Sequence, residues 1–237
     1  MLSIYRLTLR QLSSRGRLGI MLVLAMMPVV IAAVVLAGSD TMSLTEFEQF
    51  VLSTMLAGSI VPLVVLAIAT SAFGNEIEDR TLANLTLSPI PRWRIASAKL
   101  LASITIAGPL ILLSAAATAH VAFLGEWNAT IAVAVGAAAA VVMYASLFVW
   151  LGLASAQAVG VGLLYIVLWE GFFAQFVAGV RLLSIRYYAV ALMHGLDERR
   201  FEVYDHASLA AAIVMTSLVT GGFLLLAIRR LRRMDVP

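Results

Sequence analysis

The 237-residue chain is 62% hydrophobic and only 12% charged, carries a formal net charge of +3 and contains no cysteine. Soluble domains are usually about 45–50% apolar and about 25% charged, so one water-soluble core could not hide this much apolar surface. A soluble class is therefore excluded, and so are disulfides and cysteine-based metal sites or nucleophiles. The length predicts a single all-α integral membrane domain over residues 1–237, without room for a large soluble domain.

Residues 1–17 predict an amphipathic helix. Their apolar side chains fall on one face at helical spacing: Leu2, Tyr5, Leu9 and Leu12. Arg6 and Arg10 lie elsewhere on the helix, where they can meet anionic lipid headgroups. We expect this segment to lie in the membrane interface; the simpler alternative is a basic flank that only sets the topology.

Six apolar runs are long enough to cross a bilayer, whose core of about 30 Å needs about 20 helical residues. In chain order they are Leu18–Gly38, Phe50–Phe73, Leu100–Leu124, Ala129–Leu151, Ala158–Val180 and Ala207–Ile228. Helices are expected because an open sheet would leave backbone groups unpaired in hydrocarbon. The sequence therefore predicts six transmembrane helices.

Basic residues gather on one side of these predicted spans. They precede the first span, separate the second from the third and follow the sixth, whereas the loops after the first and third spans are acidic. The positive-inside rule therefore places both termini in the cytoplasm of a prokaryotic cell whose inner membrane this multi-pass protein crosses. The charges of segment 181–206 nearly balance, and we expect it to form a short external or re-entrant helical segment between the fifth and sixth spans.

The longest predicted cytoplasmic loop, residues 74–99, has an ordered pattern. An acidic cluster comes first, then short apolar helical spacing, then two prolines, and finally basic residues that lead into the third span. Acids favour the start of a helix because of its dipole, and prolines end it. The loop therefore predicts a short helix across the cytoplasmic face, braced at both ends by membrane spans. The alternative for such a charge run is a solvated connector.

This loop resembles the one between spans two and three of type-2 ABC exporter permeases. The resemblance is carried by Glu76, Glu78, Asp79, Thr81, Leu82, Leu85, Pro89, Arg92 and Lys99. Arg80 and Ala98 stand where that family commonly has glycine. The span count and the amphipathic start also match, so the resemblance covers essentially the whole chain.

The resemblance implies how such a protein would work. The loop would be a coupling helix that docks on a separate ABC ATP-binding subunit, with Arg92 and Lys99 anchoring it at the lipid surface. Two such subunits, which bind ATP and Mg, would join this chain and a second permease copy or paralogue in the lipid bilayer. The substrate path would lie mainly between the second and fifth spans, and a re-entrant element after the fifth span would form part of an external gate.

One ionisable residue, Glu170, falls well inside a predicted span, where a charge costs about 2.5 kcal/mol or more. It could bind a cationic substrate group, take part in a proton relay, or cap the start of a re-entrant helix. Trp169, Phe172 and Phe173 lie beside it. These aromatics are candidates for lining a pathway or gate, although interfacial anchoring is an equally ordinary use of such rings.

Several motifs are missing from the sequence. It contains no H-E-x-x-H metal helix, no G-x-S-x-G elbow and no G-x-x-x-x-G-K-[ST] loop. We therefore expect a chain without catalytic residues, metal or bound cofactor, and no nucleic-acid partner. The predicted function is the permease subunit of an ATP-driven exporter that moves an unidentified substrate outward or out of the inner leaflet. The alternative is a non-transporting membrane anchor or regulator of an ABC-type ATPase.

Overall fold

The computed structural model describes residues 2–37, 44–78, 90–176, 178–197 and 207–233, and every regular element among them is a helix. In chain order these are α1 (Leu2–Leu12), α2 (Arg15–Ala37), α3 (Leu44–Phe47), the π-helix η1 (Glu48–Ile60), α4 (Val61–Ala69), α5 (Ser71–Glu78), α7 (Arg92–Ala122), α8 (Trp127–Ala154), α9 (Ala158–Leu164), the π-helix η2 (Tyr165–Phe173), α10 (Ala174–Phe176), α11 (Ala178–Arg181), α12 (Ile185–Leu196) and α13 (Leu209–Arg233). The expectation of an all-helical membrane protein is confirmed.

Five helices in the described part of the chain are long and apolar enough to cross a membrane: Arg15–Ala37, Gln49–Gly74, Arg92–Ala122, Trp127–Ala154 and Leu209–Arg233. The fifth predicted span differs. Its continuous apolar part is Ala158–Phe173, made of 7 residues of α9 and 9 of η2. At 1.5 Å per residue this length reaches at most about 24 Å, less than the hydrocarbon thickness.

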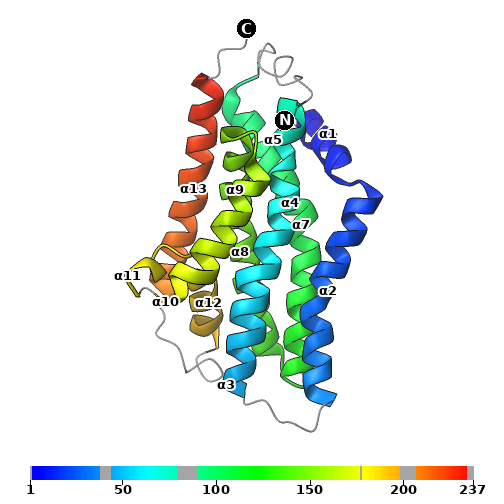
Figure 1. Cartoon of the computed structure of the whole chain (residues 1–237), viewed down its shortest axis with the longest axis vertical. Coiled ribbons are helices and arrows are strands. Elements are labelled where there is room, and N and C mark those ends of the chain that lie inside the picture. The colour runs from blue at the N-terminus through cyan, green and yellow to red at the C-terminus, as the bar shows by residue number, and fades with distance from the viewer. Residues whose placement is uncertain (1, 38–43, 79–89, 177, 198–206, 234–237) are drawn as a thin grey trace.

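The helices form an elongated bundle in which consecutive spans run in opposite directions (Figure 1). α1, α5 and the end of α13 lie at one end of the bundle, and α3 lies at the opposite end with the turn between α7 and α8. α8 is central, because it contacts α4, α7, α12 and α13. In the most apolar stretch of α8, 67% of the residues are buried, against 17% in α13. The core is therefore built around the fourth span.

Small residues let the other helices approach α8 closely. A Cβ on Gly136 would lie 2.7 Å from the backbone oxygen of Ala189 in α12, and a Cβ on Gly152 would lie 2.5 Å from that of Thr70. Such distances are shorter than real Cβ contacts, so both positions require glycine. Close backbone approach through small residues is the usual way that helices pack in lipid.

The N-terminal amphipathic helix ends at Leu12 and packs against α7. Its buried side chains are Ile4, Thr8 and Leu12, whereas Leu2 is 62% exposed. The Tyr5 hydroxyl donates to Thr105 Oγ1 over 3.0 Å. The face of α1 that packs on the bundle therefore differs from the apolar face expected from the sequence. Leucine and arginine side chains consequently lie together on the outer face of α1.

The segment after the fifth predicted span folds back onto the bundle. α12 packs along α8 between the fifth and sixth predicted spans, in the half of the molecule away from α1 and α5 (Figure 1). Its buried face includes Tyr188, Ala189, Leu192 and Met193. Part of the predicted external segment, residues 198–206, lies outside the described residues.

Candidate functional site

An ion pair joins the second and third spans where the predicted coupling loop begins and ends. Lys99 Nζ on α7 lies 2.7 Å from Glu76 Oε1 on α5. The Lys99 side chain is 0% exposed and that of Glu76 is 8% exposed. Lys99 Nζ also donates to the backbone oxygen of Ala72 and lies 4.6 Å from the centre of the Phe73 ring. Buried charges are tolerated when they are paired and hydrogen-bonded in this way.

The position of Lys99 corrects one expectation. Lys99 was expected to anchor the loop at the lipid surface, but its side chain points into the bundle and is fully buried. The reason is Glu76, which lies 23 positions earlier in the chain and supplies the opposite charge. Arg92 begins α7 and is half-buried, and its role as a lipid anchor remains a prediction.

Most of the predicted coupling residues cannot be placed. The side chain of Glu78 and the residues Asp79, Thr81, Leu82, Leu85 and Pro89 lie outside the described residues. α5 extends to Glu78 and α7 starts at Arg92, so the two ends of the loop are placed on neighbouring helices. The coupling helix itself stays a prediction.

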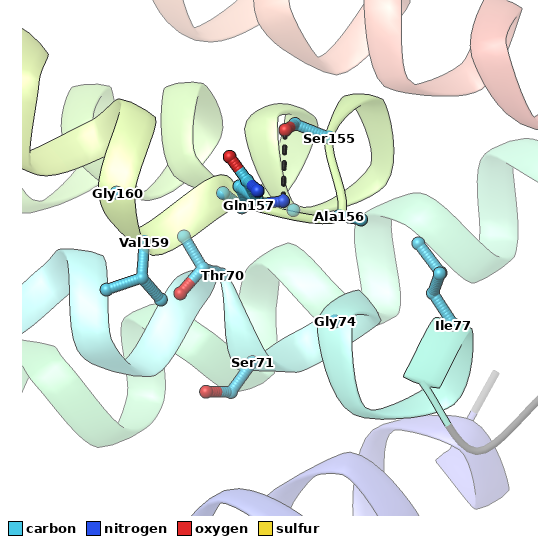
Figure 2. A pocket seen from close by; sticks show the side chains of 11 residues that line it. Thr70, Ser71, Gly74, Ile77, Ser155, Ala156, Gln157, Val159 and Gly160 are labelled. Atoms are coloured by element: carbon cyan, nitrogen blue, oxygen red, sulfur yellow. Dashed lines mark hydrogen bonds between the residues drawn. The ribbon is translucent and has the colours of Figure 1, made fainter.

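A pocket of about 410 Å³ opens on α5, the helix that carries Glu76. One wall is α4–α5 and the other is the turn from α8 into α9 (Figure 2). The lining residues are Thr70, Ser71, Gly74, Ile77, Gly152, Ser155, Ala156, Gln157, Ala158, Val159 and Gly160. Ile77 is the neighbour of Glu76 in the chain, so the pocket and the ion pair share one helix.

The pocket offers neutral polar groups and apolar surface, and none of its lining residues in the described part of the chain is charged. The Thr70 hydroxyl donates to the backbone oxygen of Leu66 over 2.6 Å. Ser155 Oγ accepts from the backbone N–H of Gln157 over 3.1 Å, drawn as a dashed line in Figure 2. A Cβ on Gly162 would lie 2.2 Å from Leu66 Cδ1, so α9 and α4 are in direct contact. Its chemistry suits an uncharged group.

Glu170 occupies a second polar site, in η2. Its side chain is 0% exposed. Oε1 accepts from the Tyr165 hydroxyl over 3.0 Å and from the backbone N–H of Ile185 over 2.9 Å, and Oε2 accepts from the Ser184 hydroxyl over 2.5 Å. Ser184 Oγ in turn accepts from the backbone N–H of Tyr187 over 3.2 Å.

These hydrogen bonds correspond to the third role considered for Glu170, the cap of a re-entrant helix. The first backbone N–H groups of a helix have no partner within it. Ser184 is the N-cap residue of α12 and Ile185 is its first residue, so the carboxylate and the serine together satisfy this helix start. The partners Tyr165 and Ser184 were not expected, because no sequence spacing links them to Glu170.

The aromatic residues near Glu170 lie on the outside of the fold. Phe172 is 54% and Phe173 is 41% exposed, and their rings contact each other edge to face. Trp169 is half-buried, and its indole N–H donates to the backbone oxygen of Leu183 over 3.4 Å. In this single chain the two phenylalanines face outward, and none of these three rings lines the pocket of Figure 2.

Comparison with known proteins gives one family match. Residues 14–190 match the family described as "ABC-2 family transporter protein". The matched region runs from just before α2 to within α12 and thus includes the ion pair, the pocket and Glu170. No curated protein matches the chain.

Proposed function

The chain belongs to the ABC-2 family of transporter proteins as a multi-pass membrane permease, and we propose that it exports a substrate with energy from ATP hydrolysed on a separate ABC ATP-binding subunit. The chain crosses the membrane six times in this proposal, with the short fifth span included and both termini in the cytoplasm. Two permease chains and two ATP-binding subunits form the transporter.

The buried ion pair is the observation that carries this proposal. Glu76 and Lys99 connect the last turns of the second span to the first turns of the third, at the two ends of residues 79–89. A buried pair of opposite charges resists separation, because each charge left alone in a low-dielectric interior is costly. A push on the loop by a partner would therefore move both spans together rather than bend the loop.

The pocket between the second and fifth spans is the proposed inner end of the substrate path. One wall of the pocket is formed by α5, the helix that carries Glu76, so a movement of α5 would change the width of the pocket. The lining residues that the structure describes are uncharged, which favours a substrate that presents an uncharged polar or apolar group at this end.

Co-purification tests whether the chain binds an ABC ATP-binding subunit through the predicted coupling loop. The chain is coexpressed with the ABC ATP-binding subunit encoded nearest to it, and the complex is captured with and without ATP. We expect Leu85→Asp to abolish capture. Leu124→Asp is the matched control, because Leu124 is 86% exposed in the turn between α7 and α8 at the opposite end of the bundle. If both variants are captured like the parent chain, the coupling loop is misassigned.

A labelling experiment tests coupling without a known substrate. Val159→Cys places a single thiol in the wall of the pocket, because the parent chain has no cysteine. We expect the maleimide labelling rate of this thiol to change when ATP and vanadate trap the complex. Glu76→Ala should remove that response while ATP is still hydrolysed.

Both outcomes of the labelling experiment are informative. A Glu76→Ala complex that responds to nucleotide like the parent would contradict the coupling role of the ion pair. Capture without any nucleotide response in the parent would favour the alternative function, a non-transporting anchor of the ATPase.

A further inference from the structure

The Glu170 carboxylate lies where three parts of the chain meet. It belongs to η2, and its three donors are Tyr165 in the same helix, Ser184 in the turn before α12 and the backbone of Ile185. Both carboxylate oxygens are therefore occupied, and the group is fully buried. A cationic substrate group would have to displace these donors, so the geometry favours a role in holding α12.

A second contact ties the start of α12 to the second span. A Cβ on Gly58 in η1 would lie 2.9 Å from Arg186 Cδ and 3.1 Å from its Nη1. The Arg186 side chain thus lies directly over a glycine that leaves it room. The first two residues of α12 are consequently attached to the fifth span through Glu170 and to the second span through Gly58.

We propose that Glu170 is a positioning residue that seats α12 on the second and fifth spans. Release of α12 from this position would strip Glu170 of two of its three hydrogen bonds in an apolar interior. Because an unsatisfied buried acceptor is costly, these hydrogen bonds hold α12 in place.

In terms of transport, α12 would be the movable part of the outer gate, and this part of the inference rests on the proposed function. The seating of α12 by Glu170 does not depend on the proposed function. It depends only on contacts within one chain, so it can be tested without the ATP-binding subunit or a substrate.

The test measures how often α12 leaves α8. Ala191→Cys places the only thiol of the chain on the buried face of α12, because Ala191 is 0% exposed and the parent has no cysteine. The full chain is placed in lipid nanodiscs, where both faces are accessible, and labelled with a hydrophilic maleimide. Ala140→Cys, also 0% exposed and within α8, reports loss of the whole fold.

Two variants are expected to loosen the seat. Glu170→Ala should raise the labelling rate of the Ala191 thiol by about tenfold or more, because one charge-assisted hydrogen bond already corresponds to roughly that factor in an opening equilibrium. Ser184→Ala removes one of the three donors and should give a smaller rise. The Ala140 thiol should stay protected. If Glu170→Ala exposes the Ala140 thiol as well, the labelling rate of the Ala191 thiol in Ser184→Ala decides the proposal.

Equal labelling rates of the Ala191 thiol in the parent and in Glu170→Ala, or in the parent and in Ser184→Ala, would overturn the seating role of Glu170.

Discussion

The ion pair between Glu76 and Lys99 makes a quantitative prediction about stability. Lys99→Met should remove the ammonium and leave the Glu76 carboxylate in a site where its residue is only 6% exposed. Glu76→Leu should leave the ammonium with the Ala72 carbonyl and the Phe73 ring as its remaining partners among the contacts described above. Each single substitution therefore breaks the ion pair and leaves one of its two charges buried.

The expected magnitude follows from that burial. Removing one partner of a buried ion pair costs about 3–5 kcal/mol, whereas replacing both partners by apolar residues is often neutral or stabilising. For a chain of this size, about 1 kcal/mol corresponds to about 2–4 °C in Tm, so each single variant should melt about 6–20 °C lower. The double variant should recover most of the loss, with a coupling energy of at least about 2 kcal/mol.

Thermal unfolding in detergent, followed by the fluorescence of the four tryptophans, measures all three variants. Arg94→Met is the matched control, because Arg94 is an exposed cation on the same helix and lies over the Trp93 ring at 5.3 Å. Its loss should change stability by no more than about 0.5–1 kcal/mol. The reasoning is refuted if Lys99→Met behaves like Arg94→Met, or if the effects of the two single substitutions simply add in the double variant.

Further predictions concern packing within the bundle. Gly152→Ala should lower Tm by several degrees, because its Cβ would lie 2.5 Å from the backbone oxygen of Thr70 and overpacking costs about 1–3 kcal/mol. Gly162→Ala should cost less, since its Cβ meets the end of a leucine side chain that can rotate. Gly160→Ala meets nothing within 4 Å and should be neutral or stabilise the helix by about 0.5–1 kcal/mol. Ser114→Ala removes a buried hydroxyl that donates to a backbone oxygen of α2 and should cost about 1 kcal/mol. One unfolding series ranks these variants, and equal losses for the substitutions at Gly152 and Gly160 would contradict the close approach.

Much of the architecture could be predicted from sequence because apolar length is a local property. Five of the six predicted spans have helices that are long enough to cross a bilayer, and the basic amphipathic start is a helix. The fifth span stays a prediction. Composition alone treats Ala158–Val180 as one run, whereas its backbone changes to a π-helix at Tyr165 and back to an α-helix at Ala174.

The polar sites could be predicted only in part, because their partners are distant in the chain. Glu170 stood out as an acid inside a span, yet Ser184 follows it by 14 positions and is an ordinary serine by sequence. Glu76 and Lys99 were both recognised as loop residues, but their pairing depends on how the second and third spans cross. Whether two distant charges pair depends on the tertiary structure. The local sequence pattern does not contain this information, so it placed Lys99 at the surface.

The ion pair also has a consequence for the biogenesis of the protein. Glu76 is synthesised before Lys99, so their ion pair cannot form until the start of the third span has left the ribosome. Charged side chains are costly in a membrane, and pairing with the next helix lowers that cost. The second and third spans should therefore be released into lipid together as a helical hairpin.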